Sequence, residues 1–382
     1  ELHSGPSRRA ADLGAALGIM ITASHNPPDD NGFKFFVQGT PASLQWIERL
    51  YQVLINQIHR KGAGIVEKKD FYADYRNALV NTTARNFQEF KLVADVGNGS
   101  AALTVPMVLN ALNCLVEILN KEPDGRFPGR GADSSDPEAL RVLGERVKKE
   151  KAQLGVAFDG DGDRIGVVDG KGRVIWGDQL LMIYGEDLLR RRPGATIIAD
   201  VKASRALFER VAELGGKPLM WKTGHSLIKA KMKETHAPLA GEMSGHVFFA
   251  DTYYGYDDAL YAAIRLIAAS ARLGRSVTEM RGAMPAVVNT PELRFHVDES
   301  RKFAAIDEVK RRLAGTDAEV NDTDGVRVTT KDGWWLLRAS NTQDVLVARA
   351  ESDTQAGLDR LLAQIDEQLE ASGLERTQQA GH

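Results

Sequence analysis

Short apolar runs separated by amphipathic stretches dominate the first three quarters of the chain. Each run is bounded by Gly, Pro, Asp or Asn, which is typical of a buried β-strand. Stretches between them, such as residues 137–152, repeat their apolar positions with a helical period. Apolar strands that alternate with helices predict an α/β fold with parallel sheets covered on both faces. The predicted strands are residues 17–22, 91–96, 114–119, 154–159, 164–169 and 195–200.

Three of these predicted strands deliver an aspartate at their carboxyl end, namely Asp95, Asp159 and Asp200. The carboxyl ends of parallel strands are where α/β sheets bind ligands. We therefore expect function to lie on the loops that follow them.

The last hundred residues have a different pattern. Strand-like runs at 292–298, 326–330, 334–340 and 345–352 follow one another without long helices between them. A helix is predicted at 357–371, because its leucines and Ile365 fall on one face. This predicts a separate α+β domain that begins near Pro285, followed by a frayed polar tail.

Composition narrows the class of protein. The 382 residues are 43% hydrophobic and 26% charged, which excludes a disordered or fibrous chain, and the net charge of -3 gives no sign of nucleic-acid binding. The single cysteine, Cys114, excludes an internal disulfide and indicates a reducing compartment. Arg265 and Arg272 interrupt the longest apolar stretch, 260–274, so we expect no membrane segment. The chain starts at Glu1 with no leader, so we expect that its natural N-terminus is missing and that it is cytoplasmic.

The stretch "FDGDGDRIG" at 158–166 is the strongest chemical signal. Asp159, Asp161 and Asp163 alternate with glycines that let the backbone turn tightly, and three converging carboxylates predict a bound cation. Oxygen-only ligands favour Mg²⁺ or Ca²⁺. An EF-hand is excluded, because Arg164 stands where its loop needs glycine and Gly170 where it needs glutamate. The alternative is an ordinary polar hairpin turn.

A dinucleotide-binding fingerprint is imitated by "DVGNGSAA" at 95–102, with Glu117 about twenty residues further on. Such patterns also arise wherever a strand turns tightly into a helix. We favour that interpretation.

Three further motifs carry polar groups suited to a sugar phosphate. "GEMSGHVFF" places Glu242, Ser244 and His246 on one face if the segment is extended. "RASNTQD" at 338–344 combines an arginine, hydroxyls and backbone N–H groups, which suits either a phosphate site or a capped turn. "WKTGHSLIKAKMKE" contributes His225, although its lysines are also typical of a solvated helix face.

Ser24, in "TASHNPPDDNGFK" at 22–34, lacks the G-x-S-x-G elbow of a hydrolase. In an extended chain the side chain of His25 points away from Ser24, so no Ser–His pair is expected.

Taken together, "TASHNPPDDNGFK", "FDGDGDR", "GEMSGH" and "RASNT", in this order and at these separations, closely resemble the α-D-phosphohexomutase family across essentially the whole chain. Methionine in the third place of "GEMSGH" resembles the bacterial phosphomannomutase/phosphoglucomutase branch, whereas the phosphoglucosamine mutase branch typically has glutamine there. The resemblance implies three related mixed α/β domains and a C-terminal α+β domain around a central cleft. The expected boundaries are 1–70 (phosphoserine), 71–172 (metal), 173–285 (sugar) and 286–382 (phosphate).

The resemblance also implies a reaction, which is reversible phosphoryl transfer between C1 and C6 of mannose or glucose phosphates. Ser24 is the expected phosphoserine, the intermediate a bisphosphorylated sugar, and the activator glucose 1,6-bisphosphate or mannose 1,6-bisphosphate. Mg²⁺ is expected on Ser24, Asp159, Asp161 and Asp163. The expected catalytic residues are Ser24, His25, Lys34, Arg164 and His246, with Lys34 the first choice as general acid/base. The expected substrate-binding residues are Lys202, His225, Glu242, Ser244, Arg338, Ser340, Asn341 and Thr342.

Other expectations follow from the family. The expected partners are small-molecule hexose phosphates; no nucleic acid and no membrane segment in this chain are expected, and a monomer is expected. Two departures stand out. The given sequence does not include the family's longer N-terminal segment, so we expect the first domain to be incomplete. Gln343 and Asp344 occupy a stretch that usually carries a proline in the family. Four alternatives stay open: phosphoglucosamine mutase, a metal-dependent phosphatase or hydrolase that needs no phosphoserine, a nicotinamide-binding oxidoreductase, and a truncated, inactive sugar-phosphate-binding protein.

Overall fold

A computed structural model describes residues 14–38, 40–58, 61–83, 87–316, 318–340 and 343–376 of the chain. The chain forms two compact units. Unit 1 comprises Glu1–Pro193 and Pro238–Gly282, and unit 2 comprises Gly194–Ala237 and Ala283–His382.

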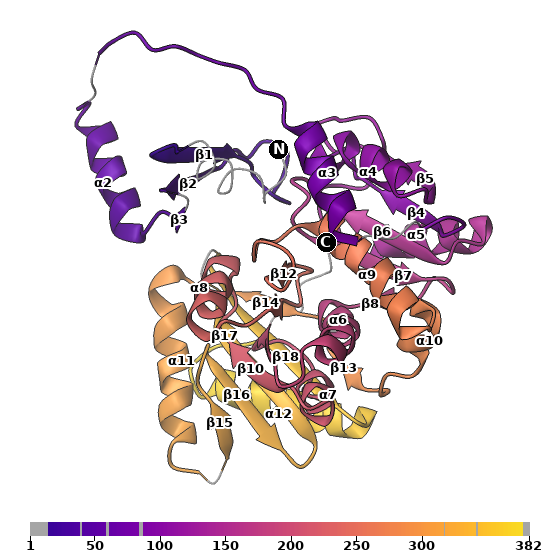
Figure 1. Ribbon diagram of the computed structural model, residues 1–382. Coiled ribbons are helices and arrows are strands. Elements are labelled where there is room, and N and C mark those ends of the chain that lie inside the picture. Colours follow the sequence, from indigo (N-terminus) through magenta and orange to yellow (C-terminus); the bar gives the residue numbers. More distant parts are fainter. Residues whose placement is uncertain are drawn as a thin grey trace. The chain divides into compact units, whose positions relative to one another are not determined.

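Unit 1 begins with a three-stranded antiparallel sheet of β1 (Leu17–Ile21), β2 (Phe33–Val37) and β3 (Thr40–Pro41), followed by α2 (Leu44–Ile55) (Figure 1). The Thr22 N–H donates to the Gly32 carbonyl at 3.0 Å and closes the loop that carries Ser24. Ser43 caps α2, all of whose residues are described and none of which is buried. The expectation of a parallel sheet is wrong here. The loop at residues 22–32 is too short for the crossover that parallel strands need, so β1 and β2 pair antiparallel.

The second sheet of unit 1 has the order β5-β4-β6-β7-β8. Its strands are β4 (Lys91–Asp95), β5 (Leu115–Leu119), β6 (Leu154–Phe158), β7 (Ile165–Asp169) and β8 (Val174–Ile175). β4 pairs with β5 and β6 in parallel, as predicted, but β6 and β7 are antiparallel. The reason is the short loop between β6 and β7, since a parallel connection needs a crossover of about a dozen residues or more.

Helices cover this sheet. α5 (Pro137–Glu150) packs Leu140, Leu143 and Val147 against apolar side chains of the strands, and α9 (Ala259–Leu273) contacts β6 and β7. A hairpin of β11 (Leu239–Gly241) and β12 (Val247–Phe249) precedes α9 in the chain. The other helical elements of unit 1 are α3 (Tyr72–Thr83), η1 (Ser100–Leu103), α4 (Val105–Ala111), α6 (Gly177–Arg191) and α10 (Val277–Gly282).

Unit 2 combines a parallel strand pair with an antiparallel sheet. β9 (Thr196–Asp200) and β10 (Lys217–Trp221) are parallel and alternate with α7 (Arg205–Glu213) and α8 (His225–Thr235). The antiparallel sheet has the order β13-β18-β17-β16-β15, with β14 also on β18. Its strands are β13 (Val288–Asn289), β14 (Leu293–His296), β15 (Glu319–Asn321), β16 (Val326–Thr330), β17 (Gly333–Ala339) and β18 (Val345–Ser352).

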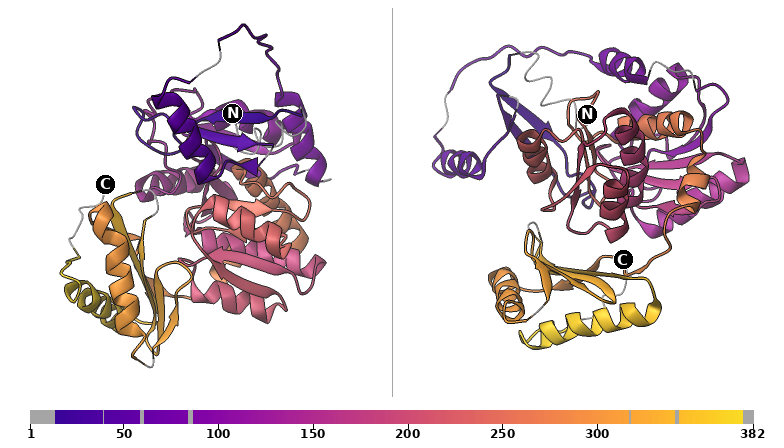
Figure 2. Two further views of the ribbon diagram at one scale, coloured as in Figure 1. Left: turned by 90° about the vertical axis from the view of Figure 1, so that its left-hand side faces the viewer. Right: turned by 60° about the horizontal axis from the view of Figure 1, so that its bottom comes forward.

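Two helices, α11 (Glu299–Leu313) and α12 (Gln355–Glu370), share one apolar core with this sheet (Figure 2). α12 was predicted, but α11 contradicts the expectation that no long helix lies between these strands. Asp298 caps its first turn, and Ala305, Ile306, Val309 and Leu313 are buried at helical spacing. Its charged face, with a lysine and two arginines in the last turn, hides this pattern in the sequence.

In the described part of the chain, every helix is too short or too polar to cross a membrane. Cys114 is buried, and burial raises the pKa of its thiol to about 12, which agrees with an inert packing role.

Candidate active site

Ser24 lies in a tight turn whose backbone is left-handed at the serine, with φ of 55°. The Ser24 N–H donates to Thr22 Oγ1 at 2.9 Å and the Asn26 N–H to the Ala23 carbonyl at 3.0 Å. This turn brings His25 Nδ1 to 3.2 Å from Ser24 Oγ. The expectation that His25 points away from the serine is therefore wrong, because the chain is not extended here.

The serine turn rests directly on the aspartate-rich loop after β6. A Cβ on Gly160 would lie 2.4 Å from the Ser24 carbonyl oxygen, so only glycine allows this approach. Ser24 Oγ lies 3.5 Å from Asp159 Oδ2, and Thr22 Oγ1 donates to Asp161 Oδ2 at 2.9 Å. Two distant parts of the sequence thus form one site.

The three aspartates of this loop converge as predicted. Asp159, Asp161 and Asp163 are buried, and one carboxylate oxygen from each lies within 4.8 Å of the others. The backbone N–H groups of Asp163 and Arg164 both donate to Asp159 Oδ1 at 3.0 Å and fix the turn. Gly162, with φ of 76°, supplies the left-handed residue that the turn needs.

Burial and the repulsion of neighbouring carboxylates raise the pKa values of Asp159 and Asp163. Burial, followed by the charge of Asp161, raises the pKa of Asp159 to about 7. Burial and the neighbouring carboxylates also raise the pKa of Asp163 well above its usual range. A divalent cation relieves such repulsion, and an all-oxygen donor set suits Mg²⁺, so these residues fit the metal that the sequence predicts.

Lys34, on β2, reaches the same carboxylates. Its Nζ lies 3.6 Å from Asp161 Oδ2 and 3.7 Å from Asp163 Oδ2. About a quarter of the side chain is exposed (28%), so the ammonium group lies at the solvent-facing edge of the aspartate cluster.

Arg164 joins the two histidines of the site. Its Nε donates to His246 Nε2 at 2.9 Å, and its Nη1 lies 3.1 Å from His25 Nε2. A guanidinium has only donors, so both neutral histidines accept at Nε2 and carry their proton on Nδ1. The His25 Nδ1–H therefore donates to Ser24 Oγ.

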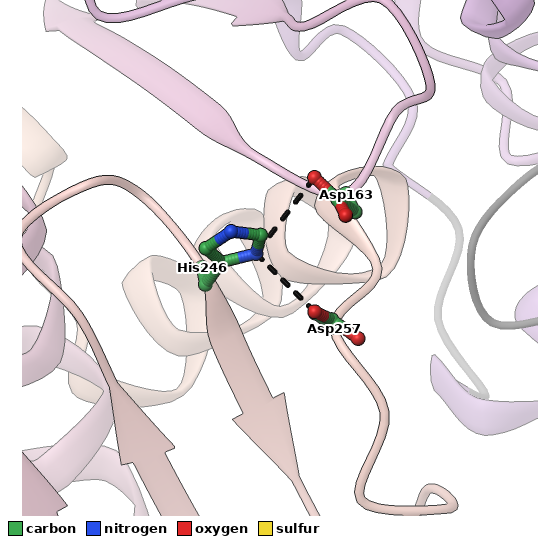
Figure 3. Close-up of side chains that lie close together, drawn as sticks. All are labelled: Asp163, His246 and Asp257. Atoms are coloured by element: carbon green, nitrogen blue, oxygen red, sulfur yellow. Dashed lines mark ion pairs between the residues drawn. The ribbon is translucent and has the colours of Figure 1, made fainter. Parts of the chain in front are cut away.

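His246 Nδ1 faces two buried carboxylates (Figure 3). Nδ1 lies 3.3 Å from Asp257 Oδ2 and 3.7 Å from Asp163 Oδ1. Sequence reasoning missed Asp257. A signal was present in the pair Asp257–Asp258 before an apolar helix: Asp258 caps α9, and a second aspartate beside the cap is a candidate for a role in the site.

Glu242, Ser244 and His246 do not share an extended face, contrary to the expectation from their alternation. They form the turn of the β11–β12 hairpin, in which the Gly245 N–H donates to the Glu242 carbonyl at 3.1 Å. Gly245 has φ of 93°, and its carbonyl accepts from the Ile165 N–H at 3.1 Å. The turn itself therefore holds His246 beside Arg164.

The other predicted substrate-binding residues belong to unit 2. Lys202 Nζ donates to Glu292 Oε2 at 2.8 Å, and Arg338 Nε donates to Asp324 Oδ2 at 2.9 Å. Ser340 Oγ accepts from the Gln343 N–H at 3.2 Å, and His225 begins α8. Asn341 and Thr342, which were also predicted, lie outside the described residues.

The glycine-rich loop at 97–99, which imitates a dinucleotide-binding fingerprint, is packed against a side chain of the protein itself, that of Arg130. Arg130 lies against Gly97, where a Cβ would be 2.5 Å from its guanidinium, and Arg130 Nε lies 3.0 Å from Asp95 Oδ2. This agrees with a tight strand-to-helix turn.

Four family models match the chain in order. They are described as phosphoglucomutase/phosphomannomutase alpha/beta/alpha domain I (residues 7–60), domain II (70–172), domain III (176–287) and C-terminal domain (292–368).

Individual proteins agree with these models. A phosphomannomutase/phosphoglucomutase of Pseudomonas aeruginosa is 44% identical over 93% of this chain and 76% of its own length. A phosphoglucomutase of Neisseria meningitidis serogroup A is 39% identical, over 93% and 78%. The crystal structure of a phosphoglucomutase/phosphomannomutase family protein from Burkholderia thailandensis has a TM-score of 0.86 and 42% identity, over 94% of this chain and 76% of that one. These names do not favour phosphoglucosamine mutase.

Proposed function

Because the chain belongs to the α-D-phosphohexomutase family and is therefore an enzyme that moves a phosphoryl group within hexose phosphates, we propose that Ser24 carries that group. The reaction interconverts mannose or glucose 1-phosphate and the 6-phosphate through a bisphosphorylated sugar. The observation that carries the proposal is the position of Ser24 Oγ, 3.5 Å from Asp159 Oδ2 and 3.2 Å from His25 Nδ1.

Ser24, Asp159, Asp161 and Asp163 would hold Mg²⁺, which neutralises charge on the transferring phosphoryl group. In the first step the Oγ–P bond of phosphoserine breaks and a bond forms between phosphorus and a sugar hydroxyl oxygen. The His25 Nδ1–H stabilises the negative charge that develops on Ser24 Oγ, and the Arg164 guanidinium stabilises charge on the phosphoryl oxygens.

The sugar hydroxyl must lose its proton as it attacks. Lys34 is our first choice as the general acid/base, and His246 is the second candidate. Asp257 supports His246, since a carboxylate 3.3 Å from Nδ1 stabilises an imidazolium there. The second step reverses the first at the other end of the sugar and restores phosphoserine.

Substrate recognition is shared by the other predicted residues. Glu242 and Ser244 bind sugar hydroxyls, Lys202 and His225 bind the sugar phosphate, and Arg338 and Ser340, with Asn341 and Thr342, grip the distal phosphate. Holding the distal phosphate orients the reacting end. Glucose 1,6-bisphosphate or mannose 1,6-bisphosphate restores phosphoserine that is lost by hydrolysis. We further propose a cytoplasmic monomer.

A coupled assay with glucose 1-phosphate and mannose 1-phosphate, Mg²⁺ and the bisphosphate activator tests the proposal. Wild type converts both substrates, and Ser24→Ala lowers kcat by about a thousandfold or more, because no other group can accept the phosphoryl. Activity retained by Ser24→Ala would instead indicate a hydrolase that uses the aspartates directly. A blank assay with wild type would indicate an inactive sugar-phosphate-binding protein.

A further inference from the structure

Asp324 connects two segments that the proposed function assigns to substrate binding. Its Oδ2 accepts from Arg338 Nε at 2.9 Å and from the backbone N–H of Thr223 at 3.0 Å. Arg338 is on β17, and Thr223 lies two residues before His225, where α8 begins. Thr223 and Asp324 are 101 residues apart in sequence, so this carboxylate is a long-range tie within unit 2.

The position of Asp324 is fixed by its own turn. It lies between β15 and β16 and is followed by Gly325, which has φ of 81°. A Cβ on Gly325 would be 2.4 Å from the Leu337 carbonyl oxygen and 2.7 Å from Arg338 Cα, so the turn is in direct contact with β17 beside Arg338. The side chains of Asp324 and Arg338 are only 14% and 6% exposed. An arginine this buried is strongly held by its carboxylate partner.

A second line of contacts leaves Thr223 in the other direction. Thr223 Oγ1 donates to Asp200 Oδ2 at 3.3 Å. Asp200 Oδ2 also lies 3.7 Å from Lys202 Nζ. Lys202 Nζ donates in turn to Glu292 Oε2 at 2.8 Å. Thr223 therefore links the carboxylate that holds Arg338 to the one beside Lys202.

We propose that Asp324 is a positioning residue for substrate binding, which aligns Arg338 with the Thr223–His225 segment before the hexose phosphate arrives. The inference rests on the proposed function. The carboxylate acts through its two partners: it fixes the plane of the guanidinium at Nε and fixes the start of α8 at the Thr223 N–H. Pre-ordering both groups removes an entropic cost of binding a phosphate.

The loss of this carboxylate is expected to affect binding more than the chemical step, because Arg338 remains and can still hold the phosphate once it is bound, so that only the pre-ordering is lost. In Asp324→Ala, KM for glucose 1-phosphate rises by about tenfold or more while kcat changes by less than about threefold. Asp324→Asn keeps one acceptor oxygen and gives a smaller rise in KM. Asp322→Ala is the matched control, since Asp322 is an exposed aspartate in the same turn.

Steady-state kinetics of wild type and the three variants, together with calorimetric titration of glucose 6-phosphate, test the proposal. It is overturned if Asp324→Ala binds glucose 6-phosphate and turns over glucose 1-phosphate like Asp322→Ala, or if kcat falls while KM stays unchanged. If Asp324→Ala does not fold, the same comparison is made with Asp324→Asn. If wild type binds but has no mutase activity, the proposed function fails, while the titrations still decide the role of Asp324. If wild type neither binds glucose 6-phosphate nor has mutase activity, both the proposed function and the proposed role of Asp324 fail.

Discussion

Arg164 is the residue through which the two histidines of the site are joined. Its guanidinium contacts His246 Nε2 from Nε and His25 Nε2 from Nη1, and so sets the tautomer of both rings. A lysine has the charge but only one nitrogen, so it cannot hold both rings.

Arg164→Lys is therefore expected to lower kcat by about ten- to a hundredfold in the coupled assay, although the charge is retained. Arg126→Lys, at a surface arginine, serves as the control. A kcat like that of wild type would show that the tautomers do not depend on Arg164.

Sequence alone predicts the arrangement of residues whose geometry depends on their immediate neighbours in the chain. Asp159, Asp161 and Asp163 converge because their spacing and glycines dictate a tight turn. The contact between His25 and Ser24 depends on one left-handed residue, and the approach of Asp257 to His246 depends on a hairpin that folds back onto β7. The local pattern of residue types predicts neither of these two contacts.

At the level of elements, the aspartate loop and the serine turn are held in van der Waals contact through Gly160. The sequence predicts this glycine as part of a tight turn, but it does not reveal that the Ser24 carbonyl lies where its Cβ would be.

Gly160→Ala is expected to push the serine turn away from Asp159. We expect kcat to fall by about tenfold or more, with a loss of about 1–3 kcal/mol in the free energy of unfolding, because a backbone oxygen at 2.4 Å must move. Gly125→Ala, where no atom lies within 4 Å of the added Cβ, should leave both unchanged. If the two variants had the same kcat and the same free energy of unfolding, the contact between Gly160 and the Ser24 carbonyl would be refuted.

The predicted strands all form, because each combines an apolar run with clear turn signals at its ends. Their pairing directions were less predictable, since loop length and not strand composition makes β6 and β7 antiparallel. α11 was missed because its buried positions are few among many charges.

For the molecule as a whole, we expect the buried aspartates to make stability depend on pH and, through the proposed Mg²⁺ site, on metal. Their pKa values in the folded protein, about 7 for Asp159 and higher than usual for Asp163, exceed the unfolded value near 4. The folded protein then binds more protons than the unfolded chain, so without metal the contribution of Asp159 to the free energy of unfolding falls as pH rises from about 4 to about 7.

At the proposed site, Mg²⁺ would have to displace these protons in order to bind. We expect the rise in Tm between EDTA and Mg²⁺ to be larger at pH 8 than at pH 6, as measured by thermal unfolding in matched buffers. Asp159→Asn should reduce this dependence on pH. An equal rise in Tm at both pH values would mean that the aspartates are already ionised in the metal-free protein.

The central claim is that Ser24 is the residue that carries the phosphoryl group. The most direct measurement is peptide mass spectrometry of the Ser24 region after incubation with glucose 1,6-bisphosphate and Mg²⁺, and again after a chase with excess glucose 6-phosphate. The account predicts one phosphoryl group on Ser24 that the chase removes. A protein that shows mutase activity but has no phosphate on Ser24, or has it on another residue, would contradict the account.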